Sequence, residues 1–208
     1  PEYALPLLSD VVSLIRDAPY PVTLHVDFKD IHPFPTDEPL QRLITLLQPI
    51  KDRVIVSSMA DWQLRKIARL APDLEIGFDP ALYLAHYRDD ADWHENPPHR
   101  RGAYGLFDDA LIAREATWPK ADYLRDRCET LMNQLPTGTT LFLNYFLLLD
   151  SLDSGFNWAE YLHQNGKKLS AWTVDSPKAD DAARRLAASG VDYITTNTPS
   201  ALSQVLSP

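Results

Sequence analysis

Polar and apolar residues alternate over residues 24–29, which read Leu-His-Val-Asp-Phe-Lys. Successive side chains of a β-strand point to opposite faces, so His25, Asp27 and Lys29 would share one face. Asp27 and Lys29 would then lie about 6.6 to 7 Å apart along the strand, at about 3.3 Å of rise per residue. A carboxylate beside a cation suits a divalent metal next to an anionic substrate. It also suits a solvated ion pair on a half-exposed strand.

The composition favours one soluble globular domain. Of the 208 residues, 45% are hydrophobic, which is enough to bury a substantial core. The net charge of -9 and the dispersed Lys and Arg residues disfavour a nucleic-acid partner, because such binding depends on clustered cations. The apolar run at 141–149 is far shorter than the roughly 20 residues of a membrane helix, so no integral membrane segment is expected. The chain begins at Pro1 without an initiator Met, which indicates a processed or partial sequence.

Apolar periodicity predicts strands that alternate with helices. The expected strands cover residues 23–28, 53–58, 74–78, 140–149, 168–174 and 193–196. The expected helices cover residues 5–16, 38–48, 61–70, 107–116, 120–135, 158–165, 177–189 and 199–206. This alternation predicts a parallel sheet covered by helices, of the α/β class. The single cysteine, Cys128, lies at helical spacing from leucines and is expected in the core.

Residues 86–105 have a different character, with many charges, consecutive prolines and three of the six histidines. A polar segment of this length is expected to be a long loop, which could influence substrate choice from a position over an active site. Its His94 and His99 match no metal-ligand spacing. We expect residues 86–138 to form a long loop or insertion.

The strand at 24–29 is unusual for a parallel sheet, whose strands normally read as continuous apolar runs because both faces are buried. Three polar side chains on one face would be costly in the centre of such a sheet. A TIM-type (β/α) barrel resolves the conflict, because residues at the carboxyl ends of its strands line the active-site mouth. Asp27 and Lys29 stand at that end of their strand.

Four segments resemble, in the same order along the chain, motifs of the glycerophosphodiester phosphodiesterase family of TIM-barrel hydrolases. They are Asp27-Phe28-Lys29, Val54-Ile55-Val56-Ser57-Ser58, Trp172-Thr173-Val174-Asp175, and Gly190-Val191-Asp192 with Thr196-Asn197-Thr198-Pro199. The chain departs from the motifs at three positions. Asp27 replaces the usual Glu, Asp175 the usual Asn, and Asn197 the usual Asp.

The resemblance implies a metal-dependent hydrolysis of glycerophosphodiesters to an alcohol and glycerol 3-phosphate. Asp27 would be a ligand of Mg²⁺ or Ca²⁺, which both take oxygen ligands. Lys29 would be catalytic, holding the phosphodiester and offsetting charge in the transition state. Trp172 would contact the small-molecule substrate, although a core position is an equally good interpretation. His25 would lie below the site in a substrate-binding or structural role.

The family motifs that precede these segments, a His-Arg strand and a Glu-x-Asp strand, are absent from the sequence. About six strands instead of eight are also expected, so residues 1–208 are interpreted as a single, partial TIM-barrel domain lacking its first strands. An alternative is a degenerate barrel that acts as a binding or structural domain. Decarboxylases of the orotidylate type also use Asp-x-Lys, but they place Asp three residues after the Lys, where this chain has His32.

Overall fold

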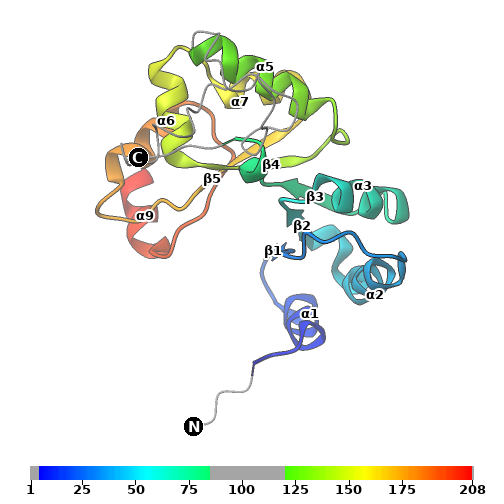
Figure 1. Cartoon of the computed structure of the whole chain (residues 1–208). Helices are drawn as coiled ribbons and strands as arrows, with labels where there is room; N and C mark the ends of the chain where they lie inside the picture. Colours follow the sequence, from blue (N-terminus) through cyan, green and yellow to red (C-terminus); the bar gives the residue numbers. More distant parts are fainter. Residues whose placement is uncertain (1–4, 85–119, 208) are drawn as a thin grey trace. The chain divides into compact units, whose positions relative to one another are not determined.

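The computed structural model describes residues 5–84 and 120–207 of the chain. They divide into two compact units, Pro1–Phe78 and Asp79–Pro208, which we call the N-terminal and C-terminal units. Figure 1 shows both, coloured along the sequence. The expected loop at 86–105, its two histidines His94 and His99, and the expected helix at 107–116 lie outside the described residues.

The N-terminal unit contains three parallel strands, paired in sequence order. The strands are β1 (Leu24–Asp27), β2 (Val54–Ser58) and β3 (Glu75–Phe78), and the helices are α1 (Leu8–Asp17), α2 (Glu38–Leu47), α3 (Asp61–Leu70) and the 3-10 helix η1 (Gln48–Arg53). Asp27 lies opposite Ser57 in the register of β1 and β2, and Ser57 lies opposite Gly77 in β3. The carboxyl ends of the three strands therefore meet at one edge of this sheet.

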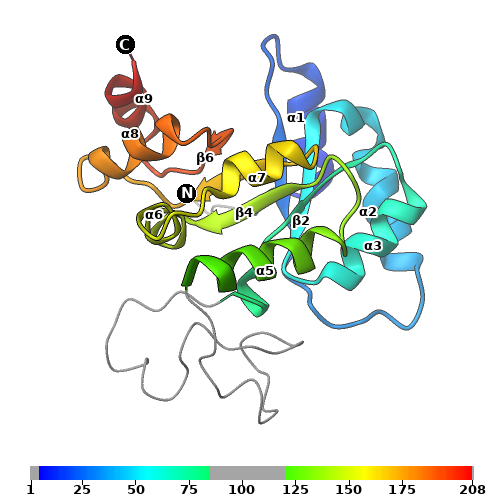
Figure 2. The same ribbon diagram turned by 90° about the horizontal axis from the view of Figure 1, so that it is seen from above.

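Helical periodicity explains how α2 covers the N-terminal unit. Leu40, Ile44 and Leu47 lie three or four residues apart, so they share one face of the helix, and all three are buried. Pro39 in the first turn is compatible with the helix, because the first backbone N–H groups have no partner within it. Helix α2 packs against α3, as Figure 2 shows from above.

The C-terminal unit contains a second set of three parallel strands, again paired in sequence order. The strands are β4 (Thr140–Asn144), β5 (Lys168–Trp172) and β6 (Tyr193–Ile194), and the helices are η2 (Pro80–Leu82), α5 (Lys120–Met132), α6 (Tyr145–Asp153), α7 (Trp158–Gln164), α8 (Asp180–Ala188) and α9 (Pro199–Leu206). Helix α7 packs on β5, and α8 packs against both α6 and α9. The α/β class expected from the sequence is confirmed in both units.

The core of the C-terminal unit is centred on Trp158, which is almost fully buried. Its indole Nε1 donates to Ser151 Oγ at 3.0 Å, so the buried polar atom is satisfied, and its ring meets Phe156 edge-on at 5.4 Å. Cys128 is fully buried, which confirms the core position expected for it, and burial raises the pKa of its thiol. A buried thiol of raised pKa is unsuited to act as a nucleophile.

The strand predicted at 140–149 is wrong in its second half. Strand β4 ends at Asn144, and helix α6 begins at the next residue. The Asn144 side chain accepts a hydrogen bond from the backbone N–H of Phe146 at 2.9 Å, as an N-cap residue does. The apolar run continues through the helix because Leu147 and Leu148 are buried there, and an apolar run alone does not distinguish a strand from a buried helix.

Two further boundaries near the end of the chain differ from the prediction. Strand β5 ends at Trp172, and helix α8 begins only at Asp180 instead of residue 177. Residues 173–179 form a loop, in which Asp175 and the backbone N–H of Ser176 are hydrogen-bonded to the loop after β6. Of the described helices, none combines the length and apolar character needed to cross a membrane.

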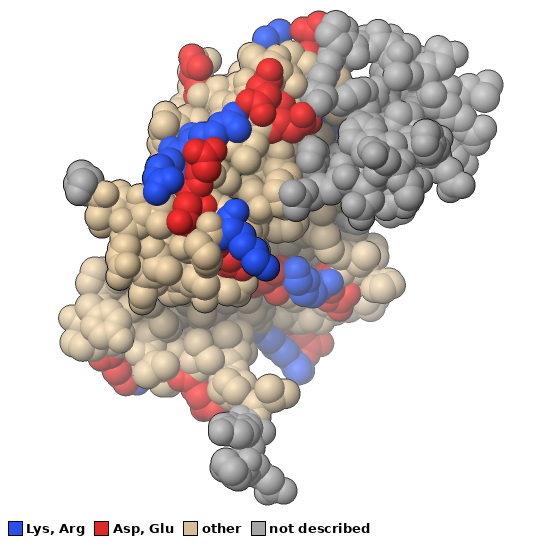
Figure 3. All heavy atoms as spheres, turned by 90° about the vertical axis from the view of Figure 1, so that its left-hand side faces the viewer, with Lys and Arg blue, Asp and Glu red and all other residues tan. Residues whose placement is uncertain are grey.

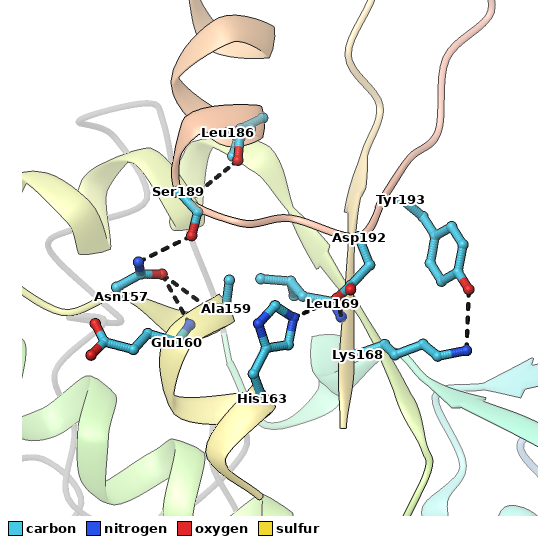
Figure 4. Close-up of polar contacts among 10 residues, drawn as sticks. All are labelled: Asn157, Ala159, Glu160, His163, Lys168, Leu169, Leu186, Ser189, Asp192 and Tyr193. Atoms are coloured by element: carbon cyan, nitrogen blue, oxygen red, sulfur yellow. Dashed lines mark hydrogen bonds and ion pairs between the residues drawn. The ribbon is translucent and has the colours of Figure 1, made fainter. Parts of the chain in front are cut away.

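Asp192 joins three elements at the amino end of β5 (Figure 4). Its Oδ2 accepts hydrogen bonds from the backbone N–H of Leu169, at 2.8 Å, and from His163 Nε2 of α7, at 2.9 Å. Gly190, with φ of +94°, allows the tight turn between α8 and Asp192. The Gly190-Val191-Asp192 motif therefore stabilises the fold at the end of the sheet opposite to the strand carboxyl ends.

Replacing Asp192 with Ala should lower the free energy of unfolding by about 1 to 2 kcal/mol, because two hydrogen bonds to a charged acceptor are lost. Denaturant unfolding measures this loss. Asp181→Ala is a suitable control, since Asp181 is exposed and makes no hydrogen bond or ion pair among the described residues. Equal stability losses in the two variants would contradict the role assigned to Asp192.

Candidate functional site

The polar face predicted for residues 24–29 is present at the end of β1. His25, Asp27 and Lys29 are exposed, whereas the apolar side chains at positions 24, 26 and 28 are less exposed, so the alternation is confirmed. The backbone N–H of Phe28 donates to the carbonyl of Ser57 at 2.7 Å, which continues the pairing with β2 beyond the end of the strand. Lys29 therefore follows directly on a backbone segment that is fixed by the sheet.

Asp27 and Lys29 form an ion pair. Lys29 Nζ lies 2.7 Å from Asp27 Oδ2, and their side chains are 51% (Asp27) and 68% (Lys29) exposed. An exposed pair of this kind contributes only about 0 to 1 kcal/mol to stability, because water and salt screen the charges. The pair therefore leaves a solvated ammonium and a carboxylate at the carboxyl end of β1, where an anionic ligand could exchange for the carboxylate.

His25 lies on the same face and contacts Ser57 of β2, with 2.6 Å between His25 Nε2 and Ser57 Oγ. Burial lowers the pKa of His25, because a partly covered ring disfavours the charged imidazolium; Asp27 raises the pKa and Lys29 lowers it further. The sequence had not predicted Ser57 as part of this cluster. Its signal was the Ser-Ser pair at the end of an apolar strand, in register with Asp27.

The loop after β1 is tied to helix α3. Gln63, which is fully buried, donates from Nε2 to the carbonyl of His32 at 2.7 Å, and Lys66 Nζ lies 3.2 Å from Asp37 Oδ1. The His32 side chain is 90% exposed. An exposed imidazole at this position does not provide the third charged group that the decarboxylase pattern places three residues after the Lys.

The described residues do not by themselves form a site for a divalent metal. Among residues 5–84 and 120–207, no three His, Cys, Asp or Glu side chains converge on one point. Asp27 offers one carboxylate, and Lys29 already holds its Oδ2. Mg²⁺ and Ca²⁺ require about six or more oxygen ligands.

In the C-terminal unit, Trp172 stands at the carboxyl end of β5, opposite Asn144 in the register with β4. Trp172 is partly buried, and its indole Nε1 is buried without a hydrogen-bond partner among the described residues. Buried indole N–H groups usually find an acceptor. A donor of this kind at the carboxyl end of a strand is compatible with the substrate contact expected for Trp172.

The loops after β5 and β6 are joined by Asp175. Its Oδ1 accepts from the backbone N–H of Asn197 at 2.7 Å and from Thr196 Oγ1 at 3.2 Å, and its Oδ2 accepts from Asn197 Nδ2 at 3.0 Å. The hydrogen bond from the Asn197 side chain is the largest cause that lowers the pKa of Asp175, since it favours the ionised carboxylate. The sequence had not assigned a role to either residue.

The structure thus brings His25, Asp27 and Lys29 together in the N-terminal unit, and it places Trp172 in the C-terminal unit.

The surface charges are mixed in sign. On the face in Figure 3, Lys and Arg atoms lie beside Asp and Glu atoms, and ion pairs such as Lys51 with Asp73 recur within the described residues.

Removing a neighbouring charge should shift the pKa of His25 in a direction set by that charge. Lys29→Met should raise this pKa, because a repelling cation is lost, and Asp27→Asn should lower it. An NMR titration of the histidine ring measures both shifts. Lys51→Met, at the amino end of β2, is the control and should leave the pKa unchanged, because salt screens charges beyond about 10 Å.

The lowered pKa of His25 also determines how the free energy of unfolding changes with pH. The unfolded chain binds a proton at His25 more readily than the folded chain, so the contribution of His25 to the free energy of unfolding is fully present above its ordinary pKa of 6.5. It is lost as the pH falls from 6.5 through the lowered pKa. Identical stability of the wild type and His25→Gln across this pH range would contradict the assignment.

Comparison with known proteins gives similarity at the level of the fold. No protein-family model and no curated protein sequence matches the chain. A glycerophosphodiester phosphodiesterase from Parabacteroides distasonis superimposes with a TM-score of 0.59 at 17% identity, covering 97% of this chain and 64% of that structure. A structure from Galdieria sulphuraria described with the same enzyme name gives a TM-score of 0.59 at 17% identity, covering 100% of this chain and 66% of the other.

A second Parabacteroides distasonis structure, a glycerophosphoryl diester phosphodiesterase, has a TM-score of 0.53 at 14% identity, with 99% of this chain and 56% of that structure covered. The chain therefore spans less than two thirds of the length of these structures. The resemblance to glycerophosphodiester phosphodiesterases, first indicated by sequence motifs, is confirmed as a similarity in fold.

Proposed function

We propose that this chain is the larger part of a phosphodiesterase that hydrolyses glycerophosphodiesters to an alcohol and glycerol 3-phosphate. The observation that carries the proposal is the solvated Lys29 ammonium beside Asp27 at the carboxyl end of β1. In TIM barrels, residues at this end of the strands form the active site. The structural similarity to enzymes of this kind supports a barrel of which the described units are part.

Lys29 would bind the phosphodiester, exchanging the Asp27 carboxylate for a phosphate oxygen. During hydrolysis, water attacks phosphorus, the bond from phosphorus to the alcohol oxygen breaks, and the alcohol leaves with a proton. Negative charge on the phosphate oxygens would then be offset by the Lys29 ammonium. His25 would act as a neutral hydrogen-bonding group beside the substrate, because burial lowers its pKa.

We also propose Mg²⁺ or Ca²⁺ as cofactor of the whole protein, with Asp27 as one ligand. The remaining oxygen donors would come from outside the described residues, since Asp27 alone does not make a site. We propose Trp172 as a substrate-binding residue of the C-terminal unit, through its ring and an indole N–H that has no partner among the described residues.

A binding or structural domain without catalysis is the second candidate. It is favoured by the high exposure of Asp27 and Lys29, which makes their contact also interpretable as a surface ion pair. The third candidate, a decarboxylase of the orotidylate type, is disfavoured because an exposed His32 lies three residues after Lys29, where that pattern has Asp. The two main candidates differ in whether Lys29 is needed for turnover.

Lys29→Met in the whole protein should lower kcat for glycerophosphodiester hydrolysis by about 10²- to 10³-fold, because a preorganised cation at the developing negative charge is lost. Release of glycerol 3-phosphate measures the rate. Asp27→Ala should also lose most activity, since Asp27 is the proposed ligand of the metal ion.

The matched control is the Lys51–Asp73 ion pair, 3.0 Å long, which lies before β2 and β3 at the opposite end of the same three strands. Lys51→Met should keep the wild-type rate. Full activity of the Asp27→Ala variant would remove the proposed hydrolase function in favour of the binding or structural role.

A further inference from the structure

The loops that follow β5 and β6 are connected by a network within the C-terminal unit. Backbone bonds continue past the strands, from Thr195 N to the carbonyl of Ala171 at 2.8 Å and from Val174 N to the carbonyl of Thr195 at 2.9 Å. Beyond them, Ser176 N donates to Thr198 Oγ1 at 2.9 Å. Trp172 therefore lies between Ala171 and Val174, whose backbone groups are both hydrogen-bonded to Thr195.

Asp175 and Asn197 form the centre of this network through two hydrogen bonds. The backbone N–H and the side-chain amide of Asn197 donate to the two oxygens of the same carboxylate. The pair thus consists of one carboxylate, which accepts both hydrogen bonds, and one residue that supplies both donors.

The geometry would also accommodate the exchanged pair, with the amide at position 175 and the carboxylate at position 197. An Asn at position 175 keeps an oxygen that can accept from the backbone N–H of residue 197, and its amide can donate to a carboxylate at 197. Two carboxylates in these positions would instead repel each other, with no donor between the side chains. Complementarity of the pair, not the identity of either residue, is therefore what the geometry requires.

We propose that Asp175 and Asn197 are a complementary pair of positioning residues, which lock the loops after β5 and β6 together and thereby fix Trp172 for substrate binding. The position of Trp172 depends on the lock because Trp172 lies three residues before Asp175, at the end of β5. The second part of this proposal rests on the phosphodiesterase function proposed above.

The test is a cycle of three variants: Asp175→Asn, Asn197→Asp and the double exchange. Asn197→Asp should speed hydrogen exchange of the backbone amides at 173–176 and 195–198 by about tenfold, because a hydrogen bond is lost and two like charges face each other. Adding Asp175→Asn to that variant should return the exchange rates to within about twofold of wild type. The same substitution in the wild type should not slow exchange.

Asn165→Asp is the matched control, because Asn165 is an exposed residue of the same unit, before the amino end of β5, and bonds only to its own helix among the described residues. It should leave exchange at 173–176 and 195–198 unchanged. Additive effects of the two exchanges, or unchanged exchange in Asn197→Asp, would overturn the lock.

Kinetics of the whole protein test the link to Trp172. Asn197→Asp should raise KM for the glycerophosphodiester with a smaller change in kcat, and the double exchange should restore KM. Faster loop exchange with an unchanged KM would overturn the positioning of Trp172. If the wild type has no phosphodiesterase activity, the proposed function fails, while rescue of hydrogen exchange by the double variant still supports the lock.

Discussion

Parallel strand pairing is the constraint on which the rest of this structure depends. In a parallel sheet the carboxyl ends of neighbouring strands meet at one edge, so residues far apart in the sequence become neighbours there. In the N-terminal unit this brings His25 beside Ser57, and in the C-terminal unit it brings Trp172 beside Asn144. The helices cover the sheets but contribute few of these polar side chains.

The two ends of the strands serve different purposes. At the amino end of β5, Asp192 bonds to Leu169 and His163, and both donors come from the elements that it joins. At the carboxyl end of β1, Lys29 and Asp27 are exposed and form an ion pair with each other. The polar groups at the amino end of β5 are thus satisfied by hydrogen bonds, whereas the charges at the carboxyl end of β1 are open to solvent.

Exposed charge at the candidate site is compatible with both binding and catalysis. The ammonium of Lys29 is solvated, so its electrostatic effect on a ligand depends on how much water the ligand displaces. The His25 ring is partly shielded from water where it contacts Ser57, and this burial lowers its pKa. The backbone that follows Lys29 is restrained, because the side chain of buried Gln63 donates a hydrogen bond to the carbonyl of His32.

The sequence by itself determined the α/β alternation, the shared face of His25, Asp27 and Lys29, and the core position of Cys128, because all three follow from local periodicity. It did not determine that β4 ends at Asn144, since an apolar run is compatible with both strand and buried helix. Only the tertiary structure decided the contacts of His25 with Ser57 and of Asp175 with Asn197. Each joins residues more than 20 positions apart, whose proximity depends on strand register and loop conformation, and neither is encoded in a local pattern.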